Sequence, residues 1–440
     1  MSETQFQVKT FGCKVNTYDS GLLQKKLQQA GFDASEDSNI HILNSCAVTA
    51  EATKEAIRSA RRIKSKNPLA TVVLTGCAAQ VDGLLTDEVP AIDLVVANSH
   101  KNDLPELLKK HFRGELDQKV FRSNIFRNES LGEGGGEELN HTRSYLKIQD
   151  GCNSFCSFCV IPFARGKSRS LPVPTLLKKI NELHEKGSNE VVLTGVHIGD
   201  YLDEETFGGP FKLDDLVEQV LNNTKIPRVR LTSLEPIEIT EKLMSLFQNP
   251  RMCRHFHMSL QSLSTPVLKG MRRNYSADQV RESLEWIQSE IPNAFVGLDV
   301  IVGFPGETEE LFNETYENLK NWPWTRIHVF PYSERKGTRA AELSDMSVPW
   351  EERKRRAKLL RELSQERFDM LATDQVGLEK EVLVVKEGES FYQSLSQDYW
   401  EVRIPSAPKM KKGELHKIRV KGYDRFSQNR MNGFLVGEVL

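Results

Sequence analysis

The sequence predicts an α/β protein in three parts: a parallel α/β unit, an incomplete parallel barrel of six β/α units, and a small all-β barrel. Short apolar runs alternate with helical patterns over residues 1–130 and again over residues 142–372, which is typical of parallel sheets covered by helices. Residues 131–141 are rich in Gly and Glu, lack periodicity and predict a linker. Residues 373–440 contain closely spaced strand patterns, which predict a small antiparallel barrel.

Composition limits the partners and the location of the protein. Its 440 residues suffice for two or three domains. The 59 basic and 61 acidic residues nearly balance, so any nucleic-acid surface must be a local patch. Seven cysteines are few and odd in number for a secreted disulfide scaffold, and no apolar run has the length of a membrane span. We therefore expect a cytoplasmic, monomeric protein with reduced thiols and no membrane association.

Each of the first three predicted strands ends at a cysteine. FQVKTFG precedes Cys13, IHILNS precedes Cys46 and VVLTG precedes Cys77 (together the strand-end cysteines), and a fourth strand covers residues 94–99. Because ligands of open parallel sheets bind beyond the carboxyl ends of the strands, these thiols are expected to converge on one iron–sulfur cluster. Three unrelated core cysteines are the alternative. The glycines directly before Cys13 and Cys77 would let the backbone approach a cofactor, or would form turns.

The densest group of cysteines is Cys152, Cys156 and Cys159 (the loop cysteines), spaced CxxxCxxC after the apolar run YLKIQ. Thiolates are soft ligands suited to iron–sulfur clusters, copper(I) or zinc, and three on one loop can reach one centre. In a four-iron cluster they leave one iron open to another ligand. A zinc site completed by a distant residue is the alternative. The spacing resembles that of the radical SAM superfamily, in which the open iron binds S-adenosylmethionine (SAM).

Polar residues end the strands predicted for the central barrel. The strand runs are SYLKIQ, EVVLTGV, RVRLTS, FHMSL, AFVGLDVIVG and RIHVFPY. Function in parallel barrels lies at the carboxyl ends of the strands. Residues there could bind the amino, carboxylate and ribose groups of SAM, or could form turns. The candidates for SAM binding are Thr194, Gly195, Ser233, Glu235, Gln261 and Asp299. His197 could line the same pocket, and the isolated Cys253 predicts a buried structural thiol.

The carboxyl-terminal strands carry many basic and aromatic side chains. The predicted strands are KEVLVVKE, YWEVRIP, HKIRVKGYD and GFLVGEVL. A small β-barrel with such side chains suits contact with the RNA backbone and base stacking, and a solvated β-domain is the alternative. The candidate stacking residues are Tyr399, Trp400, Tyr423 and Phe426. The candidate phosphate-binding residues are Lys411, Lys412, Lys417, Arg419, Lys421 and Arg425.

Along essentially the whole chain, the order of these features resembles that of the radical SAM methylthiotransferases. TFGCKVNTYDS, NSCAVTAEA and LTGCAAQ resemble the amino-terminal cluster domain of that family, and DGCNSFCSFCVIPFARGKSRS resembles its radical SAM loop. SLQS, DVIVGFPGET and FPYSERKGT are similar to its later barrel motifs. Residues 373–440 resemble its TRAM domain, an OB-like barrel that binds RNA.

The resemblance implies two [4Fe-4S] clusters and a radical mechanism. A cluster on the loop cysteines would bind and reduce SAM to generate a 5′-deoxyadenosyl radical. A cluster on the strand-end cysteines would hold and deliver the inserted sulfur. One SAM would methylate that sulfur, and the radical from another would abstract hydrogen from an unactivated aromatic carbon. An external electron donor is implied as a partner.

The resemblance extends to one branch of the family. GCKVN and IPFARGKSRS are most similar to the bacterial branch that acts on threonylcarbamoyladenosine. This implies methylthiolation of carbon 2 of N6-threonylcarbamoyladenosine at position 37 of tRNA, bound through the anticodon stem-loop. Other branches act on isopentenyladenosine in tRNA or on an aspartate of a ribosomal protein. In SLQSLS the chain departs from its branch, which usually has glycine at the position of Leu263, so a local turn is expected to differ.

Overall fold

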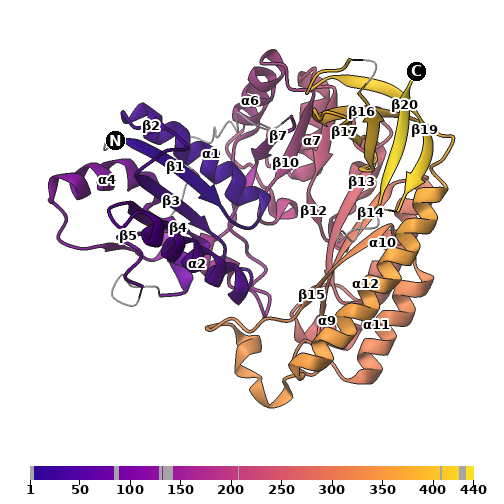
Figure 1. Cartoon of the computed structure of the whole chain (residues 1–440). Coiled ribbons are helices and arrows are strands. Elements are labelled where there is room, and N and C mark those ends of the chain that lie inside the picture. The colour runs from indigo at the N-terminus through magenta and orange to yellow at the C-terminus, as the bar shows by residue number, and fades with distance from the viewer. Residues whose placement is uncertain are drawn as a thin grey trace.

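Three β-structures joined in chain order make up the molecule, as a computed structural model shows (Figure 1). The structure describes residues 4–83, 89–127, 131, 142–206, 208–406, 409–425 and 433–440. The amino-terminal sheet and the carboxyl-terminal barrel lie on opposite sides of the central barrel (Figure 1). Of the predicted linker, all but Leu131 lies outside the described residues. No helix in the described ranges is long and apolar enough to cross a membrane.

The amino-terminal sheet is parallel throughout, with strand order β2-β1-β3-β4-β5-β6. Its strands are β1 (Gln5–Thr10), β2 (Asp33–Ala34), β3 (Ile40–Ser45), β4 (Thr71–Gly76), β5 (Leu94–Ala97) and β6 (Val120–Phe121). Its helices are α1 (Lys14–Gln29), α2 (Ala50–Lys66), α3 (Cys77–Val81) and α4 (Leu104–Arg113). The four predicted strands are confirmed. The two edge strands were not predicted, because two residues are too few to form a pattern.

The central barrel has six parallel strand positions in chain order and is open between the first and the last. Residue 232 alone separates β11 from β12, which divides the barrel into the sheets β7-β10-β11 and β12-β13-β14-β15. Among the described residues, β7 does not pair with β15. The strands are β7 (Ser144–Lys147), β10 (Glu190–Thr194), β11 (Arg228–Leu231), β12 (Ser233–Leu234), β13 (His255–Gln261), β14 (Phe295–Val302) and β15 (Arg326–Pro331). The predicted partial barrel is confirmed.

Alternation along the barrel strands separates an apolar outer layer from a polar interior. The outer helices are α6 (Val173–Glu185), α7 (Leu213–Asn223), α8 (Glu241–Leu246), α9 (Thr265–Gly270), α10 (Ala277–Glu290) and α11 (Glu309–Asn321). In β13, Phe256, Met258 and Leu260 are buried in the largest core cluster. His257 and Ser259, which alternate with them, are only half-buried. Because successive side chains of a strand point to opposite faces, the polar set lines the inside of the barrel.

The carboxyl-terminal barrel is closed by five strands in the order β16-β17-β18-β20-β19. They are β16 (Glu379–Lys386), β17 (Phe391–Ser396), β18 (Glu401–Pro405), β19 (Leu415–Asp424) and β20 (Phe434–Val439), and α12 (Trp350–Thr373) precedes them. The prediction of four strands was wrong, because β17 buries Ser394 and Ser396 where an apolar alternation was expected. The barrel is also not fully antiparallel, since β18 and β20 pair in parallel.

Candidate active site

The loop cysteines follow the first barrel strand on a segment held by backbone hydrogen bonds. Cys152 donates its N–H to the Gly166 carbonyl at 3.1 Å, and Cys159 donates to the Cys156 carbonyl at 3.0 Å. All three thiols are half-buried. Burial raises the pKa of Cys159 to about 12, and the Cys156 and Cys152 thiolates also raise it. A nearby cation is therefore needed if all three thiols are to be deprotonated at the same time.

Arg273 provides such a cation for Cys156. Its guanidinium Nη1 donates to Cys156 Sγ at 3.2 Å, and Nη2 lies 2.8 Å from Glu235 Oε1. Burial raises the pKa of Cys156, whereas Arg273 lowers it by charge and by this hydrogen bond. No sequence pattern pointed to Arg273, because it follows α9, more than a hundred residues beyond the cysteines.

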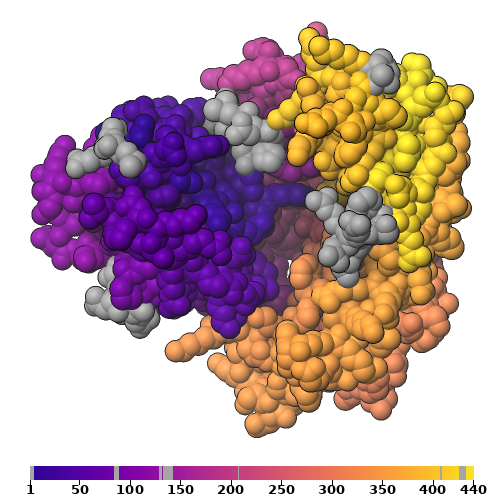
Figure 2. Space-filling model, viewed as in Figure 1, coloured from indigo at the N-terminus to yellow at the C-terminus, as the bar shows by residue number. Residues whose placement is uncertain are grey.

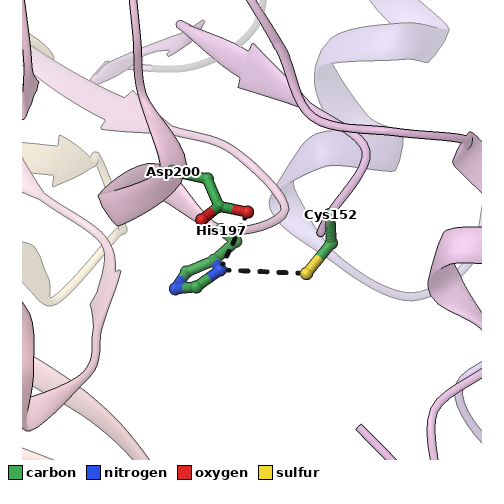
Figure 3. A group of neighbouring side chains, drawn as sticks. All are labelled: Cys152, His197 and Asp200. Atoms are coloured by element: carbon green, nitrogen blue, oxygen red, sulfur yellow. Dashed lines mark hydrogen bonds and ion pairs between the residues drawn. The ribbon is translucent and has the colours of Figure 1, made fainter. Parts of the chain in front are cut away.

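His197 lies beside Cys152 and extends the polar network (Figure 3). Its Nδ1 is 3.8 Å from Cys152 Sγ and 3.3 Å from an Asp200 oxygen, and its Nε2 is 2.5 Å from Glu238 Oε1. Cys152, His197 and Asp200 offer ligand atoms within 4.8 Å of one another, which is the geometry of the zinc alternative. This group contains one of the three loop cysteines, with Cys156 on Arg273, whereas a three-thiolate centre would use all three.

The strand-end cysteines converge at the carboxyl edge of the amino-terminal sheet. Cys46 and Cys77 are buried, and Cys13 lies exposed at the edge of the group. Burial, followed by the Cys77 thiolate, raises the pKa of Cys46 to about 12. A Cβ on Gly12, which has φ +91°, would lie 2.6 Å from Cys46 Sγ, so only glycine fits there. Gly12 therefore allows the close backbone approach, and it also makes a turn.

The two groups of cysteines lie on neighbouring elements that pack together. Val160 and Ala164, which directly follow the loop cysteines, form a small buried cluster with Cys77 and Ala47. Asn98 joins the same elements, because its amide nitrogen lies 2.9 Å from the Ala164 carbonyl and 3.7 Å from Cys77 Sγ. Both groups therefore lie where the amino-terminal sheet meets the central barrel. Figure 2 shows a hollow on one face between the indigo amino-terminal part and the orange elements of the central barrel and α12.

Buried charges fix this junction. Arg165, the last residue of α5 (Ile161–Arg165), donates to Asp150 at 2.9 Å, to Asp19 at 3.0 Å and to Asn16 at 2.5 Å. Lys147 lies 2.6 Å from Asp19 and 2.9 Å from Asp150. Arg165 also lowers the pKa of Cys13, against the desolvation of its thiol by the surrounding groups. Arg165 belongs to the string IPFARGKSRS, but the sequence alone does not reveal which residues it contacts.

The residues of both cysteine groups fit iron–sulfur clusters. Each group supplies three thiols, the donor atoms that such clusters use. Each has a buried arginine within electrostatic reach, Arg273 for the loop cysteines and Arg165 for the strand-end cysteines, which favours the thiolate form. The remaining cysteine, Cys253, is fully buried two residues before β13 and belongs to neither group.

The six candidates for SAM binding occupy different depths of the barrel. Glu235 lies nearest the loop cysteines, 3.4 Å from His197 Nε2, and burial raises its pKa. The Gln149 side chain accepts from the N–H groups of Val196 and His197, beside Thr194 and Gly195. Gln261 ends β13 with a φ of +70°.

The other two candidates lie farther from the cysteine loop. Ser233 pairs with His257 across β12 and β13. Asp299 lies inside β14 rather than at its end, and its carboxylate is 3.0 Å from His257 Nε2. Asp299 thus lies within the strand that the sequence predicted, three residues before its end, and its role in SAM binding stays a prediction.

The carboxyl-terminal barrel presents its basic residues in two ways. Lys411, Lys412 and Lys417 are exposed. The other three candidates pair with acidic side chains: Arg419 with Glu379 at 2.6 Å, Lys421 with Glu438 at 2.8 Å, and Arg425 with Asp369 at 2.9 Å.

The expected stacking role of the aromatic residues is wrong for two of them. Trp400 is only 4% exposed, and Tyr399 stacks on His255 at the start of β13 with ring centroids 3.9 Å apart. Beside them, two arginines of β11 reach the carboxyl-terminal barrel. Arg228 donates to the backbone carbonyl of Glu381 in β16, and Arg230 donates to the carbonyls of Ser396 and Gln397, at the end of β17 and just after it. The rings of Tyr399 and Trp400 therefore lie in the contact between the two barrels. Tyr423 is half-buried against Phe368, and Phe426 lies outside the described residues.

Comparisons with known proteins agree with this architecture. Residues 146–319 match the family model described as the radical SAM superfamily, and residues 5–97 match the model described as uncharacterized protein family UPF0004. A structure of the radical SAM methyltransferase TsrM from Kitasatospora setae aligns with a TM-score of 0.54 at 14% identity, over 78% of this chain and 77% of that one. At that identity the likeness concerns the fold.

Two curated relatives show the family. Threonylcarbamoyladenosine tRNA methylthiotransferase MtaB of Aquifex aeolicus is 34% identical over 400 residues, 90% of this chain and 95% of that protein. The tRNA-2-methylthio-N(6)-dimethylallyladenosine synthase of Symbiobacterium thermophilum is 33% identical over 382 residues, 82% of this chain and 79% of that protein. The radical SAM domain implies SAM and a [4Fe-4S] cluster as cofactors. This chain is a radical SAM transferase and belongs to the methylthiotransferase family.

Proposed function

We propose that this protein methylthiolates carbon 2 of N6-threonylcarbamoyladenosine at position 37 of tRNA. The observation that carries the proposal is the contact between the segment that follows the loop cysteines and Cys77 of the strand-end group. Val160 and Ala164, next to the loop cysteines, contact Cys77 of the strand-end group. Insertion of a sulfur atom at an unactivated carbon needs a sulfur carrier and a radical source at one substrate atom, and the contact at this junction supports such an arrangement.

The chain's own residues hold and orient the reactive groups. Cys152, Cys156 and Cys159 would hold a [4Fe-4S] cluster that, with SAM bound, supplies radical chemistry, and the strand-end cysteines would hold a second cluster that supplies sulfur. Arg273 favours the thiolate form of Cys156 through its charge and its hydrogen bond, and it is itself held by the Ser259 carbonyl at 2.6 Å and by Glu235. Because the site lies between two packed units, closure over a bound base would exclude water.

Two observations favour the threonylcarbamoyl substrate over the isopentenyl one. The local strings GCKVN and IPFARGKSRS are most similar to that branch. Relatives that carry its name in Aquifex aeolicus and in other bacteria cover most of this chain. The unusual Leu263 does not weaken the proposal, because its side chain is fully buried in the outer core. Isopentenyladenosine remains the second candidate, since a relative named for that product covers 82% of the chain.

Nucleoside mass spectrometry tests the proposal. Reconstituted protein, reductant, sulfide and SAM are incubated without oxygen with tRNA that carries either threonylcarbamoyl- or isopentenyladenosine. A methylthio mass gain on the threonylcarbamoyl nucleoside alone is expected. A gain only on the isopentenyl nucleoside would replace the substrate and keep the reaction. Gain on neither would direct attention to the ribosomal-protein aspartate.

A further inference from the structure

Three phenylalanines from separate segments form an exposed aromatic cluster beside the loop cysteines. Phe155 lies between Cys152 and Cys156, Phe163 lies on α5, and Phe126 lies on the short helix η2 (Ile125–Arg127) of the amino-terminal part. The ring centroids are 6.0–6.3 Å apart, with Phe126 and Phe155 nearly parallel at 18° and Phe163 on edge to both. The face of this cluster therefore spans both parts of the molecule where they meet.

Phe126 is half-buried, but core packing does not account for the other two side chains. Phe155 is 38% exposed and Phe163 is 44% exposed, although phenylalanine side chains stabilise a fold mainly by leaving water. Phe155 also has a φ of +46°, which is a strained backbone conformation for a bulky residue. Strain of this kind concentrates at functional sites. The backbone is thus held in the conformation that keeps the Phe155 ring on the surface.

The charges around the cluster are suited to a polyanion. The two segments that carry the rings, residues 120–127 and 151–169, contain five Arg or Lys and no Asp or Glu. Of these, Arg127 and Lys167 are exposed, and neither has an ion pair within the described part of the chain. On the carboxyl-terminal barrel, by contrast, Arg419 and Lys421 already pair with acidic residues. Cations without an acidic partner, beside exposed rings, are what unpaired nucleic acid needs for phosphate contact and base stacking.

We propose that Phe126, Phe155 and Phe163 form a stacking surface for an unpaired base of the tRNA anticodon loop, next to the base that is modified. This inference rests on the proposed function, since it assumes a tRNA substrate. Stacking on the rings would hold the loop open, while Arg127 and Lys167 contact the adjoining phosphates. The modified base would then enter between the two cysteine groups, a few residues from Phe155.

The test measures binding of an anticodon stem-loop RNA that carries threonylcarbamoyladenosine and has 2-aminopurine at a neighbouring loop position. Phe163→Ala and Phe126→Ala are each expected to weaken binding about 5- to 150-fold and to restore the 2-aminopurine fluorescence that stacking quenches. Phe163→Tyr should retain both the RNA affinity and the quenching of 2-aminopurine fluorescence. Phe112→Ala is the matched control, because Phe112 is also 38% exposed but lies on α4, outside the cluster.

Iron content and SAM cleavage without RNA are measured on every variant, so that misfolding is recognised. If the unaltered protein does not bind the stem-loop, the proposed function itself fails. If it binds and both alanine variants bind equally well with equal quenching, the stacking surface is refuted. Normal RNA binding combined with slower reduction by a flavodoxin would also refute it, because the rings would then serve the electron donor.

Discussion

Arg165→Met is expected to destabilise the junction between the amino-terminal sheet and the central barrel. Arg165 is buried and bonds to Asp150, Asp19 and Asn16. Methionine fills much of its volume but leaves Asp19 and Asp150 to share Lys147, with Lys101 3.6 Å from Asp19. Removal of one partner from a buried ion pair typically costs about 3–5 kcal/mol.

The pKa of Asp150 gives an independent measure of how much these ion pairs contribute to the free energy of unfolding. Burial raises this pKa, but Arg165 and then Lys147 lower it from 3.8 to about 2. Such a difference corresponds to about 2–3 kcal/mol of stability at neutral pH, shared between the two cations. Because the folded-state pKa is lowered, this contribution is present above about pH 4 and is lost as the pH falls through about 2.

Urea unfolding at pH 7 and pH 5 measures the effect. The free energy of unfolding should fall by about 3–5 kcal/mol in Arg165→Met at pH 7 and by no more than that at pH 5, because loss of Arg165 raises the pKa of the buried Asp19 and Asp150. Arg355→Met is the matched control, because Arg355 lies 2.6 Å from Glu309 and from Glu352 but is 45% exposed, and such surface pairs contribute at most about 1 kcal/mol. Equal stability of the two variants at pH 7, or a difference between them that widens from pH 7 to pH 5, would refute the reasoning.

Three further predictions concern the cysteines and the RNA-binding barrel. Cys152→Ala should abolish SAM cleavage, measured as 5′-deoxyadenosine, whereas Cys253→Ala should leave it intact; normal cleavage by the first variant would contradict the loop centre. Cys77→Ala should still cleave SAM but lose methylthiolation and about half of the roughly eight irons per chain expected for two clusters. Product from this variant would show that sulfur is held elsewhere. Lys411→Glu and Lys417→Glu should each weaken tRNA binding and reduce its salt slope by about 0.7–0.9 for each phosphate that the protein no longer neutralises. An unchanged slope would remove that barrel from the interface. Point variants are preferable to deletion of the barrel, which would uncover the two buried arginines of β11.

The sequence by itself predicted the fold class and the order of the strands. Runs such as IHILNS and EVVLTGV became β3 and β10, because a strand buried on both faces is mostly apolar and this leaves a local signal. The same is true of the loop cysteines, whose spacing alone indicates a shared centre. Local patterns failed at β17, where small serines face the interior, and at the two-residue edge strands.

Only the tertiary structure decided which distant side chains meet. Arg273 reaches Cys156 from a turn after α9, and Arg165 joins Asp19 across the junction. Trp400 lies in an interface rather than on an RNA surface. Long polar side chains act at their ends, several ångströms from the backbone, and their partners are separated by many residues. Periodicity and spacing record what a residue does within its own element, so they cannot record contacts that arise only when the elements pack.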